Sequence, residues 1–159
     1  METEIAIVGA GIIGISTAFF LSKLNHDVTL FDRKNIGEEA SGRNAGSLSM
    51  QNKPQAIIPL AIKGMKTWEE LDSEIGGLGL KQTGGLRVAE TEVELERLHQ
   101  DRKIQNKHDL GIEYLNPNQV NSLAPYLNHT LKGANYSPLD GYSDALSSGR
   151  IIAKEAEKN

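Results

Sequence analysis

The sequence predicts an α/β fold that opens with a βαβ unit and continues into the beginning of a mixed α+β domain. Two short apolar runs rich in β-branched residues, Ile5–Val8 and Val28–Phe31, are typical of parallel strands that are covered on both faces. Between these runs, apolar residues recur at helical spacing from Ile12 to Leu24, and a polar turn follows. Beyond residue 53 the regular order of strand and helix is lost, which predicts a second and different part.

The composition excludes several classes of protein. The 159 residues include 38% apolar side chains, enough for the core of about one domain, and no cysteine, which excludes a disulfide scaffold. The 17 basic and 21 acidic residues nearly balance and form no long run of one sign, so neither a nucleic acid nor an acidic membrane surface is an expected partner. The first residues lack the pattern of a signal peptide or membrane anchor, so we expect no integral membrane segment and a cytoplasmic protein.

Spacing and capping signals predict the later elements. Residues 32–53 show no periodicity and are rich in small and polar side chains, which indicates a functional loop or a disordered segment. Apolar residues three or four apart predict an amphipathic helix over Ile58–Ile75, with Trp68 in its buried stripe and Pro54 or Pro59 in its first turn. The remaining expected elements are a strand within 82–89, a charged helix that starts at the Thr91–Glu94 capping box and ends at Gly111, a strand at 112–115, a helix start at 116–119, a strand at 131–136 and a final helix capped by Asp144.

The first strand is followed directly by a match to the motif G-x-G-x-x-G. Gly9 permits the tight turn from strand to helix, Gly11 leaves room for a pyrophosphate to approach the backbone, and Gly14 lets the helix lie close to the strand. The amides of this segment, including those of Ile12 and Ile13, stand at the positive end of the helix and predict a site for paired phosphates. The alternative is a set of glycines that serve only the turn.

Asp32 closes the second strand, eighteen residues after the last glycine of the motif. A carboxylate at this position can accept hydrogen bonds from both hydroxyls of a ribose, so the motif and Asp32 together predict dinucleotide binding by a Rossmann-like unit. The same charge would repel a ribose 2′-phosphate and therefore disfavours NADP. Arg33 has two open interpretations, a contact with the adenosine or a solvated cation at a strand end.

Further residues carry a resemblance to a known family. The glycine motif, Asp32, the run Ala40–Gly46 and the later segment Gly84–Ala89 together resemble the FAD-dependent D-amino acid oxidase superfamily. Within it the chain is similar to glycine oxidase, to D-amino acid dehydrogenase and other bacterial amine dehydrogenases, and to subunits of opine oxidase and hydrogen cyanide synthase. The resemblance covers nearly all 159 positions and ends with Asp140–Asp144, which is similar to the segment where such chains return from the substrate domain to the FAD domain.

The resemblance implies FAD, rather than NAD, as the cofactor. It implies that five residues, namely Ser41, Arg43, Asn44, Ala45 and Gly46, lie along the FAD pyrophosphate and the edge of the flavin. Small residues let a backbone approach a flat ring, and Arg43 can balance the charge of a phosphate or of the reduced flavin. Without the resemblance, the same run is also typical of a flexible surface loop.

Some members of the superfamily hold the flavin covalently through Cys or His. The chain has no Cys, and its four histidines, His26, His99, His108 and His129, all fall outside the run from residue 41 to residue 46. Noncovalent FAD is therefore expected. The histidines also lack metal-ligand spacing, so no metal site is expected and each histidine is interpreted as a surface or turn residue.

The resemblance and the element order together predict the domains. Residues 1–53 and 139–159 are parts of an FAD-binding domain, and residues 54–138 are part of a substrate or cap domain. Only two central strands are visible, whereas a doubly wound sheet needs more strands to pair its edges. Members of the resembled family are more than twice this length, so we expect the chain to be the amino-terminal part of a longer protein or a shortened product.

The leading hypothesis is an FAD-dependent oxidoreductase that oxidises the C–N bond of an amino acid or amine by hydride transfer to the flavin, with the isolated chain inactive. The residues identify no catalytic group, and Arg87 is equally consistent with an ordinary strand residue. Two alternatives stay open. One is an NAD-dependent dehydrogenase that shares the first βαβ unit. The other is a non-catalytic fragment or interaction module that pairs with a missing C-terminal portion or self-associates through an open sheet edge.

Overall fold

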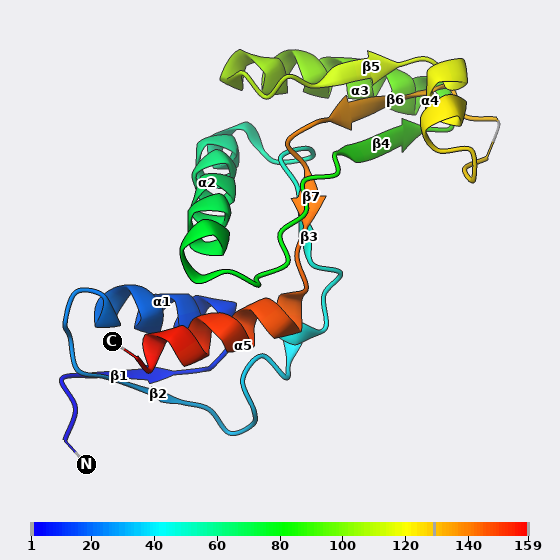
Figure 1. Cartoon of the computed structure of the whole chain (residues 1–159). Helices are drawn as coiled ribbons and strands as arrows, with labels where there is room; N and C mark the ends of the chain where they lie inside the picture. The colour runs from blue at the N-terminus through cyan, green and yellow to red at the C-terminus, as the bar shows by residue number, and fades with distance from the viewer. Residues whose placement is uncertain (1, 129, 159) are drawn as a thin grey trace. The chain divides into compact units, whose positions relative to one another are not determined.

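The computed structural model describes residues 2–128 and 130–158 (Figure 1). The chain forms two compact units: the first comprises Met1–Ser47, Trp68–Leu80 and Ser143–Asn159, and the second comprises Leu48–Thr67 and Lys81–Tyr142. The chain therefore leaves the first unit and returns to it twice. The assignment of these units to an FAD domain and a substrate domain stays a prediction. His129, interpreted above as a surface or turn residue, lies outside the described residues.

The first unit is built on a parallel two-stranded sheet of β1 (Ile5–Val8) and β2 (Val28–Phe31). The helix α1 (Ile12–Ser22) connects the two strands, and α5 (Ala145–Ala156) lies beside α1 over the same face of the sheet (Figure 1). The last turns of the long helix α2 (Ile58–Ile75) also belong to this unit. The predicted βαβ unit is confirmed.

The core of the first unit joins the sheet to its helices. Ile15 and Phe19 of α1 and Ile152 of α5 are each 1% exposed and form one cluster. From α2, Leu71 joins this cluster and Trp68 packs against it, which confirms the predicted core position of Trp68. Each fully buried side chain of this size contributes about 1.5–3 kcal/mol to stability through the hydrophobic effect, which holds the helices on the sheet.

The opposite face of the β1–β2 sheet is exposed in the described chain. Ala6 and Val8 alternate with the half-buried Ile5 and Ile7 of β1, and Val8 is 87% exposed. On β2, Phe31 is 49% exposed. Here the structure differs from the expectation of strands covered on both faces. A continuous apolar run indicates that both faces of a strand are apolar, but it does not reveal whether other elements cover each face. Both outer edges of the two-stranded sheet lack a strand partner among the described residues.

The second unit holds an antiparallel sheet in the order β4 (Gly85–Ala89), β6 (Gly133–Ser137), β5 (Glu113–Leu115). Two helices, α3 (Glu92–Gln105) and α4 (Pro117–Leu123), accompany it. Each strand overlaps a segment where the sequence predicts one, and β6 runs one residue past the predicted end at residue 136. The mixed order of helices and antiparallel strands expected beyond residue 53 is therefore confirmed.

Neighbouring residues of β6 face the two helices. Asn135, 1% exposed, donates from Nδ2 to the carbonyl of Leu98 on α3 at 2.8 Å. The next residue along the strand points to the opposite face, and there Ala134 forms a cluster with Leu131 and with Val120 of α4. The central strand is thus covered by α3 on one face and by α4 on the other.

Both predicted helix starts in this unit are confirmed by their caps. The Thr91 hydroxyl accepts from the Glu94 amide at 3.2 Å, and the Glu94 carboxylate accepts from the Thr91 amide at 3.0 Å. Asn116 and Gln119 make the same reciprocal pair at the start of α4. Each cap satisfies amides that have no partner within their helix.

The predicted end of α3 at Gly111 is wrong. The helix ends at Gln105, and Asp109 then adopts a left-handed conformation with φ of 57°. The physical reason is local: the Asn106 side chain accepts from the Ile112 amide and donates to the Ile112 carbonyl, both at 2.8 Å. A side-chain amide that bonds the backbone in this way competes with continued helix, and spacing alone does not reveal it.

The other described elements are short. They are 3₁₀ turns at Ala40–Gly42, Gln55–Ile57 and Asn106–His108, and β3 (Ser47–Leu48), which pairs with β7 (Gly141–Tyr142).

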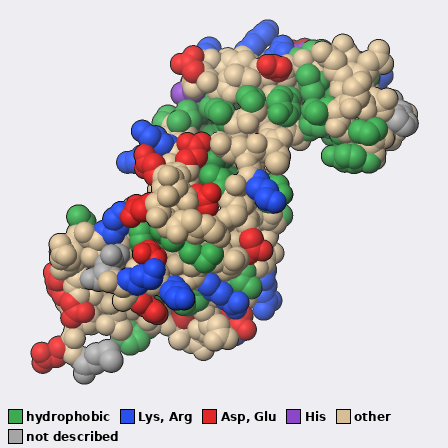
Figure 2. All heavy atoms as spheres, in the orientation of Figure 1, with side chains coloured by type: hydrophobic (Ala, Val, Ile, Leu, Met, Phe, Trp, Pro, Cys, Tyr) green, Lys and Arg blue, Asp and Glu red, His purple; other side chains and the backbone are tan. Residues whose placement is uncertain are grey.

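The surface carries charges of both signs. Figure 2 shows acidic and basic side chains interspersed on the visible face, in line with the small net charge. Within residues 2–128 and 130–158, none of the helices has the length and apolar character needed to span a bilayer.

Candidate nucleotide-binding site

The glycine motif forms the turn between β1 and α1, and each glycine has a steric role. Gly9 has φ of 111°, a conformation that favours glycine, and its amide donates to the Phe31 carbonyl at 2.7 Å. A Cβ on Gly14 would lie 1.9 Å from the Gly9 carbonyl oxygen, so α1 approaches the end of β1 too closely for any side chain there. A Cβ on Gly11 would lie 2.9 Å from the Ser41 hydroxyl oxygen. The turn requires glycine at positions 9 and 14, and a side chain at position 11 would displace the Ser41 hydroxyl.

The amides of this turn are divided between occupied and free groups. Ala10 donates to the Asp32 carboxylate at 2.7 Å, and Ile12 donates to the Ser41 hydroxyl at 3.0 Å. The amides of Gly11 and Ile13 make no hydrogen bond with any other described residue. These two donors stand at the amino end of α1, where the helix dipole favours an anion.

Asp32 is held against the glycine turn. One carboxylate oxygen accepts from Ala10 and the other accepts from the Lys34 amide at 2.9 Å. The Lys34 amide, and then the Ala10 amide, lower the pKa of Asp32 below its ordinary value, so the exposed carboxylate is ionised at neutral pH. Because each oxygen can accept a second hydrogen bond, Asp32 retains the capacity to bind the hydroxyls of a ribose.

A hollow of about 740 Å³ lies beside Asp32 within the first unit. It extends along β2, where Val28 and Leu30 line it, and reaches the turn at Ala10. Ala153 of α5 forms part of its other wall. The space next to the carboxylate is thus not filled by side chains, as a site for a large ligand requires.

Ser41 is brought to the turn from 29 residues away in the sequence through its contact with Ile12. Asn44 then organises the loop from within: its Nδ2 donates to the Ser41 carbonyl at 2.6 Å, and its Oδ1 accepts from the Gly46 amide at 2.7 Å. Gly46 has φ of 68° and lies so close to Ser143 that a Cβ would sit 1.9 Å from the Ser143 carbonyl oxygen. Ala45, between these anchored residues, is exposed. The loop is therefore ordered by hydrogen bonds and packing.

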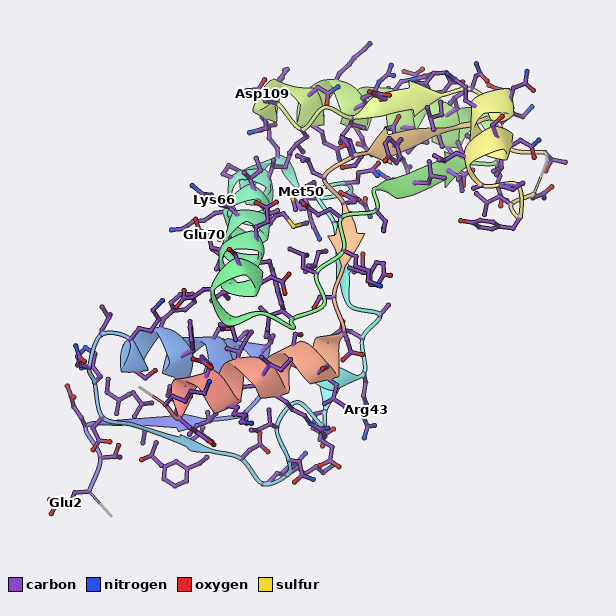
Figure 3. All side chains as sticks on the ribbon, in the orientation of Figure 1. Glu2, Arg43, Met50, Lys66, Glu70 and Asp109 are labelled. Carbon is purple, nitrogen blue, oxygen red and sulfur yellow. The ribbon has the colours of Figure 1, made fainter. Side chains whose placement is uncertain are left out.

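Neither predicted arginine contacts the turn. The Arg33 side chain is 81% exposed and lies 3.5 Å from the Glu39 carboxylate. Arg43, labelled in Figure 3, is exposed and donates from Nε to the Glu38 carbonyl at 3.0 Å. For Arg33, both interpretations, a contact with the adenosine and a solvated cation at a strand end, stay predictions. Glu39 also pairs with Lys34 at 2.5 Å, which lowers the pKa of the glutamate.

Two residues outside the predicted set help to shape the site. The Gly37 amide donates to the Ala10 carbonyl at 2.9 Å, which ties the loop after β2 to the glycine turn. The Lys34 amide, described above, supports Asp32. Gly37 could have been found from the sequence as a glycine in a loop that follows a strand, but a backbone amide such as that of Lys34 leaves no sequence signal.

Arg87, which the sequence left without an assigned role, lies in the second unit. Arg87 pairs with Asp101 at 2.6 Å in the second unit, so its guanidinium already has a carboxylate partner. Asp101 is only partly exposed, and Arg102 lies 5.6 Å from the centre of the Tyr114 ring. The described residues contain no group of three or more His, Asp or Glu side chains arranged to hold a metal ion.

Comparisons with known proteins give relatives that match nearly the whole chain. The chain is 30% identical to glycine oxidase of Geobacillus kaustophilus, over 96% of this chain and 43% of the relative. The crystal structure of glycine oxidase from that organism matches 98% of the chain and 44% of its own with a TM-score of 0.91 at 28% identity. A reduced α-glycerophosphate oxidase from Mycoplasma pneumoniae, solved with FAD bound, matches with a TM-score of 0.91 at 25% identity, over 99% of this chain and 43% of that one.

The chain thus spans less than half the length of these relatives. The family described as FAD dependent oxidoreductase, of the D-amino acid oxidase type, matches residues 4–159. That range includes the glycine turn, the aspartate and the ordered loop. Because the match takes in nearly the whole sequence, the chain belongs to this family of oxidoreductases, whose cofactor is FAD.

Proposed function

We propose that the chain carries the cofactor-binding portion of an FAD-dependent oxidoreductase that oxidises the C–N bond of an amino acid or amine. The observation that supports this most is the meeting of three groups at one turn. The free amides of Gly11 and Ile13, the Asp32 carboxylate and the Ser41 hydroxyl come from separate segments and lie together around the amino end of α1. This set matches the phosphate and ribose chemistry of FAD.

Each group has a distinct role in the proposal. The amides of Gly11 and Ile13 donate to the pyrophosphate, and the missing side chain of Gly11 leaves room for the Ser41 hydroxyl beside them. Ser41 accepts from Ile12 through its oxygen, so its own hydrogen is free to point at a phosphate oxygen. Asp32 binds the ribose hydroxyls.

The ordered loop that ends at Gly46 is proposed to follow the flavin edge. Asn44 fixes the backbone, and Ala45 presents a small side chain that lets a flat ring approach. FAD, when bound, supplies the acceptor for a hydride from the substrate carbon. The substrate class rests on relatives named for glycine and D-amino acid oxidation. The absence of Cys from the chain supports noncovalent binding.

Titration with FAD tests the proposal. We expect quenching of FAD fluorescence and thermal stabilisation of the wild-type chain, and neither effect with NAD. Asp32→Asn should bind FAD about tenfold more weakly, because the neutral amide is a weaker acceptor for the ribose hydroxyls. Asp109→Asn changes the same functional groups at an exposed left-handed position, where Asn is tolerated, and should bind like the wild type. Equal binding by the two variants would contradict the role of Asp32.

A second candidate function is supported by the exposed face of the β1–β2 sheet. Val8 and Phe31 expose apolar surface there, and the sheet edges lack strand partners among the described residues. Parallel sheets are normally covered on both faces. We propose that the chain in isolation self-associates, or pairs with a further polypeptide segment, through this surface.

A further inference from the structure

The second unit contains a buried carboxylate that the proposed FAD chemistry does not use. Asp140 is 5% exposed, and its carboxylate accepts from the Ser49 hydroxyl at 2.7 Å and from the Met50 amide at 2.7 Å. The Gln51 side-chain amide donates to the same carboxylate at 3.4 Å. These three donors are consecutive residues about 90 positions away in the sequence. No Lys or Arg forms an ion pair with Asp140 in the described chain, so neutral donors alone balance it.

The same aspartate also joins a third segment. Its carbonyl accepts from the Gly84 amide at 2.9 Å, and a Cβ on Gly85 would lie 2.8 Å from the Asp140 side chain. Gln51 donates from the same Nε2 to the Gly85 carbonyl at 2.9 Å. The missing side chain of Gly85 therefore makes room for the carboxylate. A buried carboxylate held by such specific donors fixes the segments that supply them.

The segment held in this way continues the proposed flavin loop. Only β3 separates Gly46, where that loop ends, from Ser49. In the first unit the Ser143 amide donates to the Gly46 carbonyl at 3.0 Å, so the returning chain also holds the end of the loop. Met50, labelled in Figure 3, is 4% exposed and is fixed through its backbone amide.

We propose that Asp140 is a positioning residue for the flavin site: its carboxylate fixes residues 49–51 and, through them, the exit of the loop that lines the flavin. This inference rests on the proposed FAD binding. Asp140 contacts neither the turn nor the loop and acts through the segment that it holds. The sequence resemblance places Asp140 where the chain returns to the first unit, but it assigns the residue no role.

The variant Asp140→Asn tests the proposal with a nearly unchanged shape. Asparagine replaces one acceptor oxygen with a donor, so at least one of the three donors from residues 49–51 loses its hydrogen bond to residue 140. We expect faster hydrogen exchange in residues 47–52, about tenfold weaker FAD binding and an altered visible spectrum of the FAD that binds. Asp109→Asn is the matched control and should behave as the wild type in all three measurements.

The outcomes separate this inference from the proposed function. Wild-type chain that binds no FAD would refute the proposed function, and the inference with it. If the wild type and Asp140→Asn bind FAD with the same affinity and the same visible spectrum, the inference alone is refuted. This holds even if hydrogen exchange is faster in Asp140→Asn. Should Asp140→Asn fail to fold, Ser49→Ala removes one donor without leaving an unpaired one. Ser49→Ala should show the same three changes, each smaller than in Asp140→Asn. If Ser49→Ala instead matches the wild type in all three measurements, the proposal is overturned.

Discussion

At the residue scale, Asp32 and Ser41 show how far sequence reasoning reaches in this site. Asp32 is predictable because the second strand of a βαβ unit ends beside the glycine turn. The spacing from the glycine motif then identifies which acidic residue lies at that strand end. The contact between Ser41 and the Ile12 amide is not predictable from spacing. It requires the segment that follows β2 to return to the amino end of α1, 29 positions back in the sequence, and composition does not determine such a return.

The depressed pKa of Asp32 predicts a specific pH dependence of stability. The backbone amides of Lys34 and Ala10 stabilise the charged form in the folded state, so folding stability gained from Asp32 is fully present above its ordinary pKa of 3.8. That contribution is lost as the pH falls through the lower pKa of the folded state. Asp32→Asn should therefore be less stable than the wild type at neutral pH, with a difference that narrows in acid.

Urea unfolding at a series of pH values, followed by circular dichroism, measures this difference. The unfolding midpoints of the wild type and Asp32→Asn should differ by a constant amount above pH 3.8 and converge below it. A difference that stays the same down to the most acid pH would show that the two amides do not stabilise the charged form.

At the element scale, the packing of α1 against the end of β1 depends on Gly14. Gly14→Ala places a methyl group against the Gly9 carbonyl, which backbone atoms cannot avoid by rotamer change. We expect a loss of about 1–3 kcal/mol in the free energy of unfolding, together with weaker FAD binding as the turn moves. Gly64→Ala in α2 is the matched control, because a Cβ there meets no atom within 4 Å.

Denaturant unfolding of the two variants gives the comparison. Gly64→Ala should be neutral or more stable by up to about 1 kcal/mol, since alanine is the better helix former. Equal midpoints for Gly14→Ala and Gly64→Ala would show that the close approach of helix and strand is not required.

The elements also show what the sequence could not predict. Capping boxes and apolar spacing located the starts of α3 and α4 and the whole of α2, because these signals are local. The end of α3 was missed because it depends on one side chain, that of Asn106, bonding the backbone of Ile112. Likewise, the apolar runs of β1 and β2 indicated strands but not which faces would be covered.

At the scale of the whole molecule, family and cofactor follow from the sequence, and the architecture agrees with them. The glycine motif and the run from Ala40 to Gly46 identified the family that matches residues 4–159. The order of the strands within the second sheet, β4, β6, β5, was beyond reach because pairing partners far apart in sequence leave little local signal.

The exposed face of the β1–β2 sheet predicts self-association of the isolated chain. Ala6→Lys places a charge on this face, at an exposed position next to Val8, and should shift the chain from associated forms to the monomer. Leu60→Lys on α2 is the control, since Leu60 is also exposed, at 65%, but lies far from β1 in sequence and outside the first unit. Sedimentation velocity at several protein concentrations measures the effect. Equal association of both variants and the wild type would assign the contact to another surface.

The central claim is that the turn between β1 and α1 binds the phosphates of FAD. Amide chemical shifts of the ¹⁵N-labelled chain, followed by NMR during titration with FAD, test it most directly. We predict that the largest shifts fall on Gly11 and Ile13, whose amides are free in the described chain. Saturating shifts confined to residues of the second unit, with those two amides unmoved, would contradict the claim.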